Sequence, residues 1–216
     1  MSPLKVLFPT DFSQRANKAL EEAIVFCEKT KSELLIYHVY HRPYAETGSL
    51  ADMDAKTARL EQQIERQFAD LGKYCPAIND IKHEFRRDLG VSIEKIVELA
   101  NEDQIDLIIS ATKGAKGFGE LWGTKTEKII KEVNIPVLII PDDSTIDGLG
   151  KIALTCDYSD KTDYESLEMV VDLAEHFKSN VDVISLNQDL MAMADYGDQS
   201  SEEFHNRKLV RSLLED

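Results

Sequence analysis

The chain has 216 residues, and its 40 Asp and Glu against 25 Lys and Arg give a formal net charge of −15 at pH 7. Nucleic-acid binding relies on clustered basic side chains, so this balance argues against a DNA or RNA partner. The hydrophobic fraction of 43% is ordinary for a globular protein, and the length suits one or two domains. Its longest apolar runs are the size of a strand, which argues against a membrane-spanning helix.

The start of the chain indicates a cytoplasmic protein, and its cysteines indicate no disulfide framework. Residues 1–5 lead directly into a strand-like run, without the basic start and apolar stretch of a signal peptide. Cys27, Cys75 and Cys156 are odd in number and widely spaced. They therefore predict neither a disulfide framework nor a cysteine-based metal site. We expect the protein to remain in the cytoplasm because its start does not resemble a signal peptide.

Up to about residue 143, short apolar runs alternate with segments of helical periodicity. The expected strands, in chain order, are Lys5–Pro9, Glu33–Tyr40, Ile81–Phe85, Asp106–Ser110 and Ile135–Ile140. The expected helices between them are Gln14–Thr30, Gly48–Tyr74, one that opens at Ser92, and Lys125–Glu132. This alternation predicts a mostly parallel α/β sheet with helices on both faces.

The charge and composition of the chain change after residue 143. Residues 146–216 hold 16 acidic and 6 basic side chains, so they carry most of the negative charge. We place a first domain at 1–143, a linker rich in turn-forming residues at 144–150, and a second unit at 151–216. The second unit opens as an internal repeat, because Lys151–Ser159 and Lys5–Ser13 share Lys, Asp, Ser and the aromatic residue before the Ser.

The repeat is expected to be incomplete. A helix at Tyr164–Lys178 and a strand at Val181–Leu186 continue it, and a tail helix containing Phe204 and Leu213 is expected near the end. Nothing corresponds to the third, fourth and fifth strands of the first domain. Two strands make a poor independent core, so the second unit either belongs to a longer tandem protein or completes itself against a neighbour.

Two loops carry the candidate chemistry. In an open parallel sheet, ligands bind beyond the carboxyl ends of the strands where the strand order reverses, here expected between the first and fourth strands. The first strand ends in Pro9–Ser13, and the fourth is followed by the glycine-rich segment Ala111–Thr124. Glycines let backbone N–H groups approach a phosphate, and the start of a helix favours an anion. Lys113, Lys116 and Lys125 add positive charge, so the sequence predicts a phosphate site there.

Together these motifs resemble the universal stress protein family of the tandem type, a family of stress-response proteins. The run Asn134–Ile140 matches the family's usual final strand, and the likeness covers 1–141 and resumes over roughly 151–186. The resemblance implies a Rossmann-like, adenine nucleotide alpha hydrolase-like fold. Its expected form is an open five-stranded parallel sheet with strand order 3-2-1-4-5, followed by a partial repeat of the same fold.

The resemblance also implies binding of ATP or a related adenine nucleotide, with or without Mg²⁺. By this likeness Asp11 lies by the nucleoside, Val39 offers its backbone to adenine, and Gly114, Gly123 and Thr124 hold phosphates. Their neighbours in the two loops complete the expected binding residues: Pro9, Thr10, Ala111, Lys113 and Lys125. Ala111 stands where ATP-binding members carry a first glycine, and the spacing from Gly114 to Gly123 is one residue shorter than theirs.

Several alternatives stay open. Asp11 or Ser13 equally suits the cap of the helix that follows, and the glycine-rich segment also suits a plain connection. The expected function is nucleotide-dependent assembly or partner binding. Because the glycine-rich loop departs from the family pattern, two alternative functions stay open. One is a dimerisation or scaffold module that binds no nucleotide, and the other is a sensor of another small anion. No catalytic triad, metal-binding motif or Walker loop occurs, so at most slow ATP hydrolysis is expected.

The fifth strand predicts self-association. Val137–Ile140 is apolar and is expected at a sheet edge, where unpaired backbone groups invite another strand. In a complete tandem chain the second repeat supplies that strand, as the resemblance implies. Here we expect two copies of the chain to pair through this edge as a homodimer.

Overall fold

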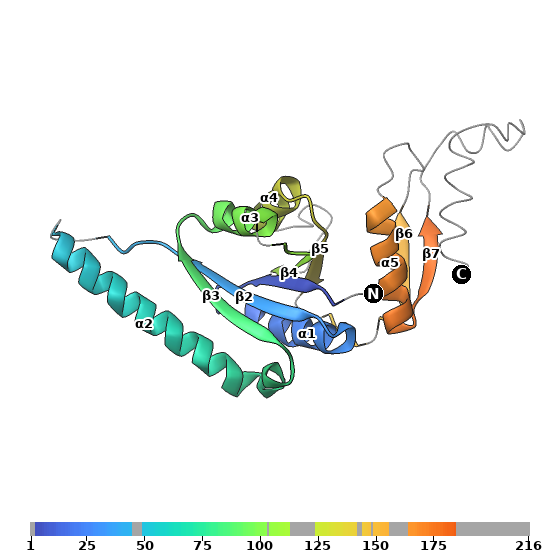
Figure 1. Ribbon diagram of the computed structural model, residues 1–216, viewed down its shortest axis with the longest axis horizontal. Coiled ribbons are helices and arrows are strands. Elements are labelled where there is room, and N and C mark those ends of the chain that lie inside the picture. Colours follow the sequence, from blue (N-terminus) through green and yellow to red (C-terminus); the bar gives the residue numbers. More distant parts are fainter. Residues whose placement is uncertain are drawn as a thin grey trace, which may run out of the picture. The chain divides into compact units, whose positions relative to one another are not determined.

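The computed structural model describes residues 3–44, 49–102, 104–112, 124–141, 144–147, 149–155 and 164–184. The chain divides into two compact units, residues 2–146 and 147–216 (Figure 1). Among the expected site residues, Lys113, Gly114 and Gly123 lie outside the described part, as does the expected tail helix with Phe204 and Leu213.

The first unit is built on a sheet of five parallel strands in the order β3-β2-β1-β4-β5. The strands are β1 (Lys5–Pro9), β2 (Glu33–Tyr40), β3 (His83–Leu89), β4 (Leu107–Thr112) and β5 (Val137–Pro141). Leu7 of the central strand pairs with Leu35 of β2 on one side and with Ile108 of β4 on the other. This topology confirms the expected strand order 3-2-1-4-5.

Helices cover both faces of the sheet. They are α1 (Gln14–Thr30), α2 (Leu50–Tyr74), α3 (Ser92–Glu102) and α4 (Thr124–Glu132), with a short 3-10 turn at Pro76–Asp80. Figure 1 shows α1 and α2 on one side of the sheet and α3 and α4 on the other. Val6, Leu7 and Phe8 are each 0% exposed, because a central parallel strand has both faces covered.

The second unit contains β6 (Lys151–Thr155), α5 (Tyr164–Phe177) and β7 (Asn180–Ile184). Its two strands are parallel, and Lys151 pairs with Asn180 at their amino ends. Residues along both strands alternate between exposed and half-buried. One face of this two-stranded sheet is therefore partly covered and the other is exposed. In the described parts of both units, no helix combines the length and the hydropathy needed to cross a bilayer.

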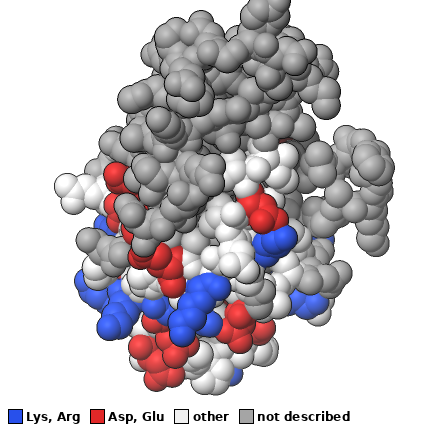
Figure 2. All heavy atoms as spheres, turned by 90° about the vertical axis from the view of Figure 1, so that its right-hand side faces the viewer, with Lys and Arg blue, Asp and Glu red and all other residues white. Residues whose placement is uncertain are grey.

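Positive and negative side chains are mixed on the described part of the surface seen in Figure 2. Figure 2 shows one face of the molecule, on which the described Lys and Arg side chains are interspersed with Asp and Glu. No continuous basic stripe crosses the residues coloured in that view. A nucleic-acid groove needs such a stripe, so this face offers none in its described part.

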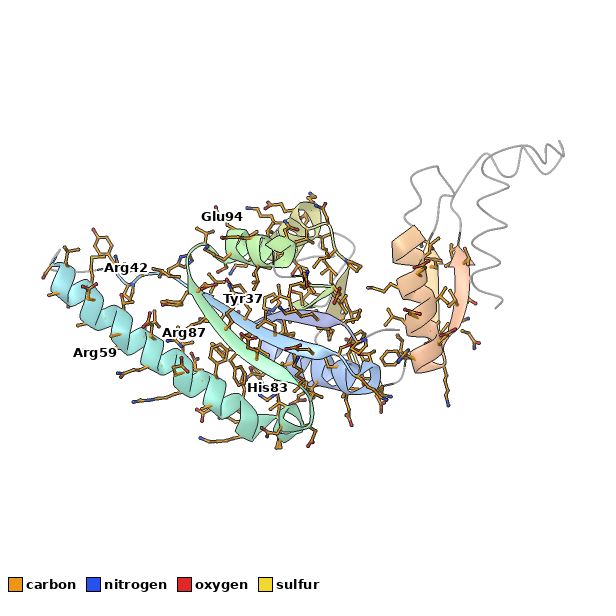
Figure 3. The ribbon with its side chains drawn as sticks, viewed as in Figure 1. Tyr37, Arg42, Arg59, His83, Arg87 and Glu94 are labelled. Atoms are coloured by element: carbon orange, nitrogen blue, oxygen red, sulfur yellow. The ribbon has the colours of Figure 1, made fainter. Side chains whose placement is uncertain are left out.

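The third strand is displaced from its expected position. The sequence predicts it at Ile81–Phe85, whereas β3 runs from His83 to Leu89 and pairs with β2 along its length. Its second half is polar, so the sequence there lacks the apolar run that indicates a strand. β3 is an edge strand, and its Arg87 is directed toward α2, where it forms an ion pair with Glu65 (Figure 3).

Candidate functional site

A cavity of about 180 Å³ lies at the carboxyl ends of the central strands. Its walls come from the β1–α1 turn, the ends of β2 and β4, and the first two turns of three helices. The lining residues are Pro9, Thr10, Asp11, Ser13, Arg15, Ala16, Tyr37, Val39, Ser92, Ile96, Ser110, Ala111, Lys125, Thr126 and Ile129. Because β1 lies between β2 and β4, this is where the strand order reverses and where ligands of open α/β sheets bind.

Six of the ten expected site residues line this one cavity: Pro9, Thr10, Asp11, Val39, Ala111 and Lys125. Thr124 is the first residue of α4, and the remaining three lie outside the described residues. Arg15, Ser92 and Thr126 also line the cavity, although they are not among the expected site residues. Each lies near the start of a helix that follows a central or neighbouring strand, and this position in the sequence is the signal by which they could be predicted.

The β1–α1 turn is held by hydrogen bonds within its own few residues. The Phe12 N–H donates to Thr10 Oγ1 at 3.0 Å, and the Ser13 N–H donates to Asp11 Oδ1 at 3.0 Å. Ser13 Oγ accepts from the Ala16 N–H at 3.2 Å and caps α1. Ser13 is therefore the cap of the helix, and Asp11 braces the turn that precedes it.

Phe12 has an unusual backbone conformation within this turn. Its φ of 58° lies in the left-handed region, which costs a residue with a bulky side chain about 1–2 kcal/mol. The Phe12 ring lies 4.7 Å from the His38 ring and 5.0 Å from the Phe68 ring, measured between centroids. Nothing local in the sequence predicts a positive φ at a phenylalanine, because the contacts that favour it come from distant segments.

Asp11 carries its charge at neutral pH. Partial desolvation raises the pKa of Asp11, but hydrogen bonds from Ser13 and from its own backbone outweigh this effect, and the charge of Lys125 adds to them. The net result is a pKa below the usual value. Asp11 thus offers the cavity an acceptor for ligand hydroxyl or amino groups, while Lys125 offers a positive charge from the first turn of α4.

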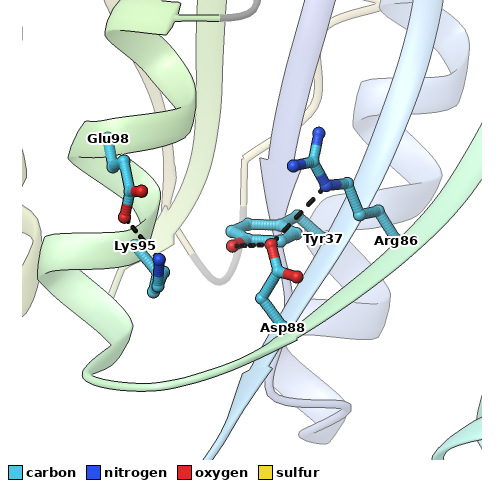
Figure 4. Close-up of polar contacts among 5 residues, drawn as sticks. All are labelled: Tyr37, Arg86, Asp88, Lys95 and Glu98. Atoms are coloured by element: carbon cyan, nitrogen blue, oxygen red, sulfur yellow. Dashed lines mark hydrogen bonds and ion pairs between the residues drawn. The ribbon is translucent and has the colours of Figure 1, made fainter.

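Tyr37 is the buried aromatic side chain of the cavity wall. It is 1% exposed, and its hydroxyl donates to Asp88 Oδ2 at 2.8 Å (Figure 4). The same carboxylate oxygen lies 3.5 Å from Arg86 Nε. Burial raises the pKa of Tyr37, and Asp88 raises it further. The hydroxyl therefore keeps its proton at neutral pH and directs it at Asp88.

The cavity lining includes both cationic and apolar side chains. Arg15 and Lys125 are cationic, and with the start of α4 they suit an anion. Val39, Ile96 and Ile129 are apolar and suit a flat ring. The lining therefore offers one place for an anion and another for a flat ring. In the described part of the chain, no group of three or more His, Cys, Asp and Glu is placed to hold a metal ion.

Comparisons with known proteins agree on one family. Residues 4–141 match the model of the universal stress protein family. The chain is 27% identical to universal stress protein MJ0577 of Methanocaldococcus jannaschii, over 63% of this chain and 93% of that protein. It is 26% identical to universal stress protein A homolog 1 of Coxiella burnetii, over 62% of this chain and 94% of the relative.

Solved structures show the same likeness. The structure of MJ0577 superposes with a TM-score of 0.53 and 26% identity, covering 65% of this chain and 97% of that one. A universal stress protein from Archaeoglobus fulgidus gives a TM-score of 0.64 at 17% identity, covering 96% of this chain and 74% of the other. At that identity the second likeness concerns the fold alone.

Proposed function

This chain belongs to the universal stress protein family, and from that premise we propose that its first unit binds ATP or a related adenine nucleotide in the cavity beside β1 and β4. One observation carries the proposal. Asp11 and Lys125 come from segments far apart in the sequence, yet they line one cavity together with Val39 and Ala111. The cavity lies where the strand order reverses, and its cationic and apolar side chains match the two parts of a nucleotide.

The proposal assigns a role to nine of the ten expected residues. Asp11 accepts hydrogen bonds from the nucleoside, and the backbone of Val39 meets the adenine. The phosphates lie against Thr124 and Lys125 at the start of α4, where orphan N–H groups and the helix dipole favour an anion. Lys113, Gly114 and Gly123 complete the phosphate site from the glycine-rich segment, while Pro9 and Thr10 shape the opposite wall.

We also propose that nucleotide occupancy sets assembly or partner binding. β5 is an edge strand of the sheet, and Ala111 of the cavity pairs directly with Ile140 of β5. The helix that connects β4 to β5 is α4, whose first turn lines the cavity. A ligand that draws in α4 therefore acts on the segment leading to this edge, through which two copies pair as a homodimer.

The second unit and the location are parts of the same proposal. Residues 1–143 form a universal stress protein domain, 144–150 a linker, and 151–216 a partial second repeat. The parallel pairing of β6 and β7 around α5 supports the repeat, since it matches the β-α-β start of the first unit. Free thiols at Cys27 and Cys75 support a cytoplasmic location, where thiols stay reduced.

Equilibrium binding of ATP with Mg²⁺ to the full chain, measured by calorimetry, tests the nucleotide proposal. We expect saturable binding that Gly114→Glu abolishes, because the new carboxylate repels the phosphates. Gly72→Glu is the matched control: Gly72 lies on α2, and a side chain there meets open space. No binding at millimolar ATP, or equal binding by the Gly114→Glu variant, contradicts the proposal.

The scaffold alternative rests on Ala111, which replaces the first glycine of the family's motif. It predicts a dimer whose dissociation constant is the same with and without ATP. Nucleotide-dependent assembly predicts that ATP shifts this constant, and sedimentation equilibrium separates the two. A different anion carried through purification, identified by mass spectrometry, favours the sensor alternative.

A further inference from the structure

The nucleotide proposal leaves Phe12 without a role. Phe12 is in the left-handed backbone region, with a φ of 58°, between Asp11 and the cap residue Ser13. A bulky residue holds such a conformation only where its surroundings enforce it, and these positions cluster at ligand sites. The internal repeat of the sequence places another aromatic residue, Tyr158, at the same point between Asp and Ser.

The Phe12 ring is enclosed by aromatic side chains from two other elements. His38 of β2 lies 4.7 Å away in a tilted arrangement, and Phe68 of α2 lies 5.0 Å away, edge to face. Aromatic pairs at these separations are favourable beyond the area that they bury. Phe68 is itself 4% exposed, so the α2 side of this contact is fixed by packing.

His38 holds the other side of the turn. Its Nδ1 lies 2.8 Å from the Thr10 carbonyl oxygen, and because a carbonyl only accepts, Nδ1 carries the proton and donates it. The Thr10 N–H in turn donates to the Tyr37 carbonyl at 2.8 Å. The two residues that flank Asp11 are therefore both anchored, Thr10 through β2 and Phe12 through ring contacts.

We propose that Phe12, His38 and Phe68 form an aromatic clamp that holds the β1–α1 turn, and with it Asp11, in the conformation that meets the ligand. Phe12 acts as a positioning residue, since its side chain does not line the cavity. The identity of the ligand rests on the nucleotide proposal. Without the clamp the turn leaves the left-handed conformation, fewer molecules are competent to bind, and the apparent dissociation constant rises in proportion.

A pair of matched variants tests the clamp. Phe12→Leu keeps a Cβ, and so the backbone cost, but removes the ring. Phe85→Leu removes a ring from the same cluster on the side away from the turn, because Phe85 contacts Phe68 at 4.8 Å and His83 at 5.2 Å. We expect Phe12→Leu to raise the dissociation constant for ATP with Mg²⁺ about tenfold and Phe85→Leu to change it by less than about twofold. Equal effects of the two variants overturn the clamp.

His38 provides a rescue test. His38→Leu removes the donor to Thr10 and is expected to weaken ATP binding, whereas His38→Gln keeps an N–H donor and should restore part of the affinity. Equal losses in these two variants contradict the hydrogen-bonding role of His38.

Hydrogen exchange of the Phe12 and Ser13 amides tests the clamp without any ligand. Both amides donate within the turn, so their exchange should accelerate in Phe12→Leu and stay unchanged in Phe85→Leu. If the native chain binds no ATP, the nucleotide proposal fails, and the exchange rates alone decide the clamp. Unchanged exchange in Phe12→Leu overturns it.

Discussion

The hydrogen bond from Tyr37 to Asp88 predicts that the effect of Tyr37→Phe on stability depends on whether Asp88 is present. The Tyr37 hydroxyl is buried and donates to Asp88 Oδ2 at 2.8 Å. Asp88→Ala removes that acceptor and leaves a buried donor unsatisfied, which costs about 1–3 kcal/mol. The lost ion pair with Arg86 adds little, because both side chains are more than a third exposed. We expect Asp88→Ala to lower the free energy of unfolding by about 2 kcal/mol.

Tyr37→Phe should depend on which residue stands at position 88. In the native background it removes a hydrogen bond and lowers the free energy of unfolding by about 1 kcal/mol. In the Asp88→Ala background it removes the unsatisfied hydroxyl instead, so it should be neutral or stabilising. Urea titrations of the four proteins, followed by circular dichroism, measure this coupling.

Glu98→Ala is the control for this cycle. Glu98 lies near the pair and is bonded to Lys95 Nζ at 2.6 Å (Figure 4), but it does not contact the Tyr37 hydroxyl. Its removal should cost less than about 0.5 kcal/mol. A cost of Tyr37→Phe that is the same in both backgrounds, within about 0.5 kcal/mol, refutes the reasoning.

Four further predictions concern Tyr37, Asp11, Lys125 and Glu22. The pKa of Tyr37 is raised above its usual 10.0, so the contribution of its hydroxyl to stability is fully present below pH 10 and lost as the pH rises further. Urea titrations should therefore show the free energy of unfolding of Tyr37→Phe approaching that of the native protein above pH 10. The pKa of Asp11 is lowered from 3.8, so its contribution is present above that pH and lost as the pH falls; Asp11→Asn should flatten the acid limb of the stability profile, and an unchanged limb contradicts the shift. Lys125→Ala should weaken ATP binding about fivefold and AMP binding less, as measured by calorimetry; equal losses exclude a role at the β- and γ-phosphates. Glu22 Oε2 accepts from the Ile146 N–H at 2.6 Å, so Glu22→Ala should speed exchange of that amide, and unchanged protection contradicts the contact.

The elements around β1 could be predicted because their signals are local. The strand Lys5–Pro9 and the helix Gln14–Thr30 have the bounds expected from the sequence, since one is an unbroken apolar run and the other keeps a 3.6-residue period. The position of β3 could be predicted less accurately. Its polar half gains partners only in the folded chain, where Asp88 meets a tyrosine 51 residues away and Arg87 meets α2.

The candidate site divides in the same way. Topology predicts that loops after β1 and β4 meet, and the cavity brings Asp11, Ala111 and Lys125 together as expected. Ser13, rather than Asp11, caps α1, a choice that composition alone leaves open. The left-handed Phe12 and the Tyr37 hydrogen bond depend on contacts between separate elements, so no local pattern reports them.

A crystal structure of the full chain grown with ATP and Mg²⁺ tests the central claim most directly. The account predicts a nucleotide in the cavity beside β1 and β4, with Asp11 contacting the nucleoside and Lys125 beside the phosphates. Nucleotide bound elsewhere on the chain, or a cavity that stays empty at millimolar ATP, contradicts it.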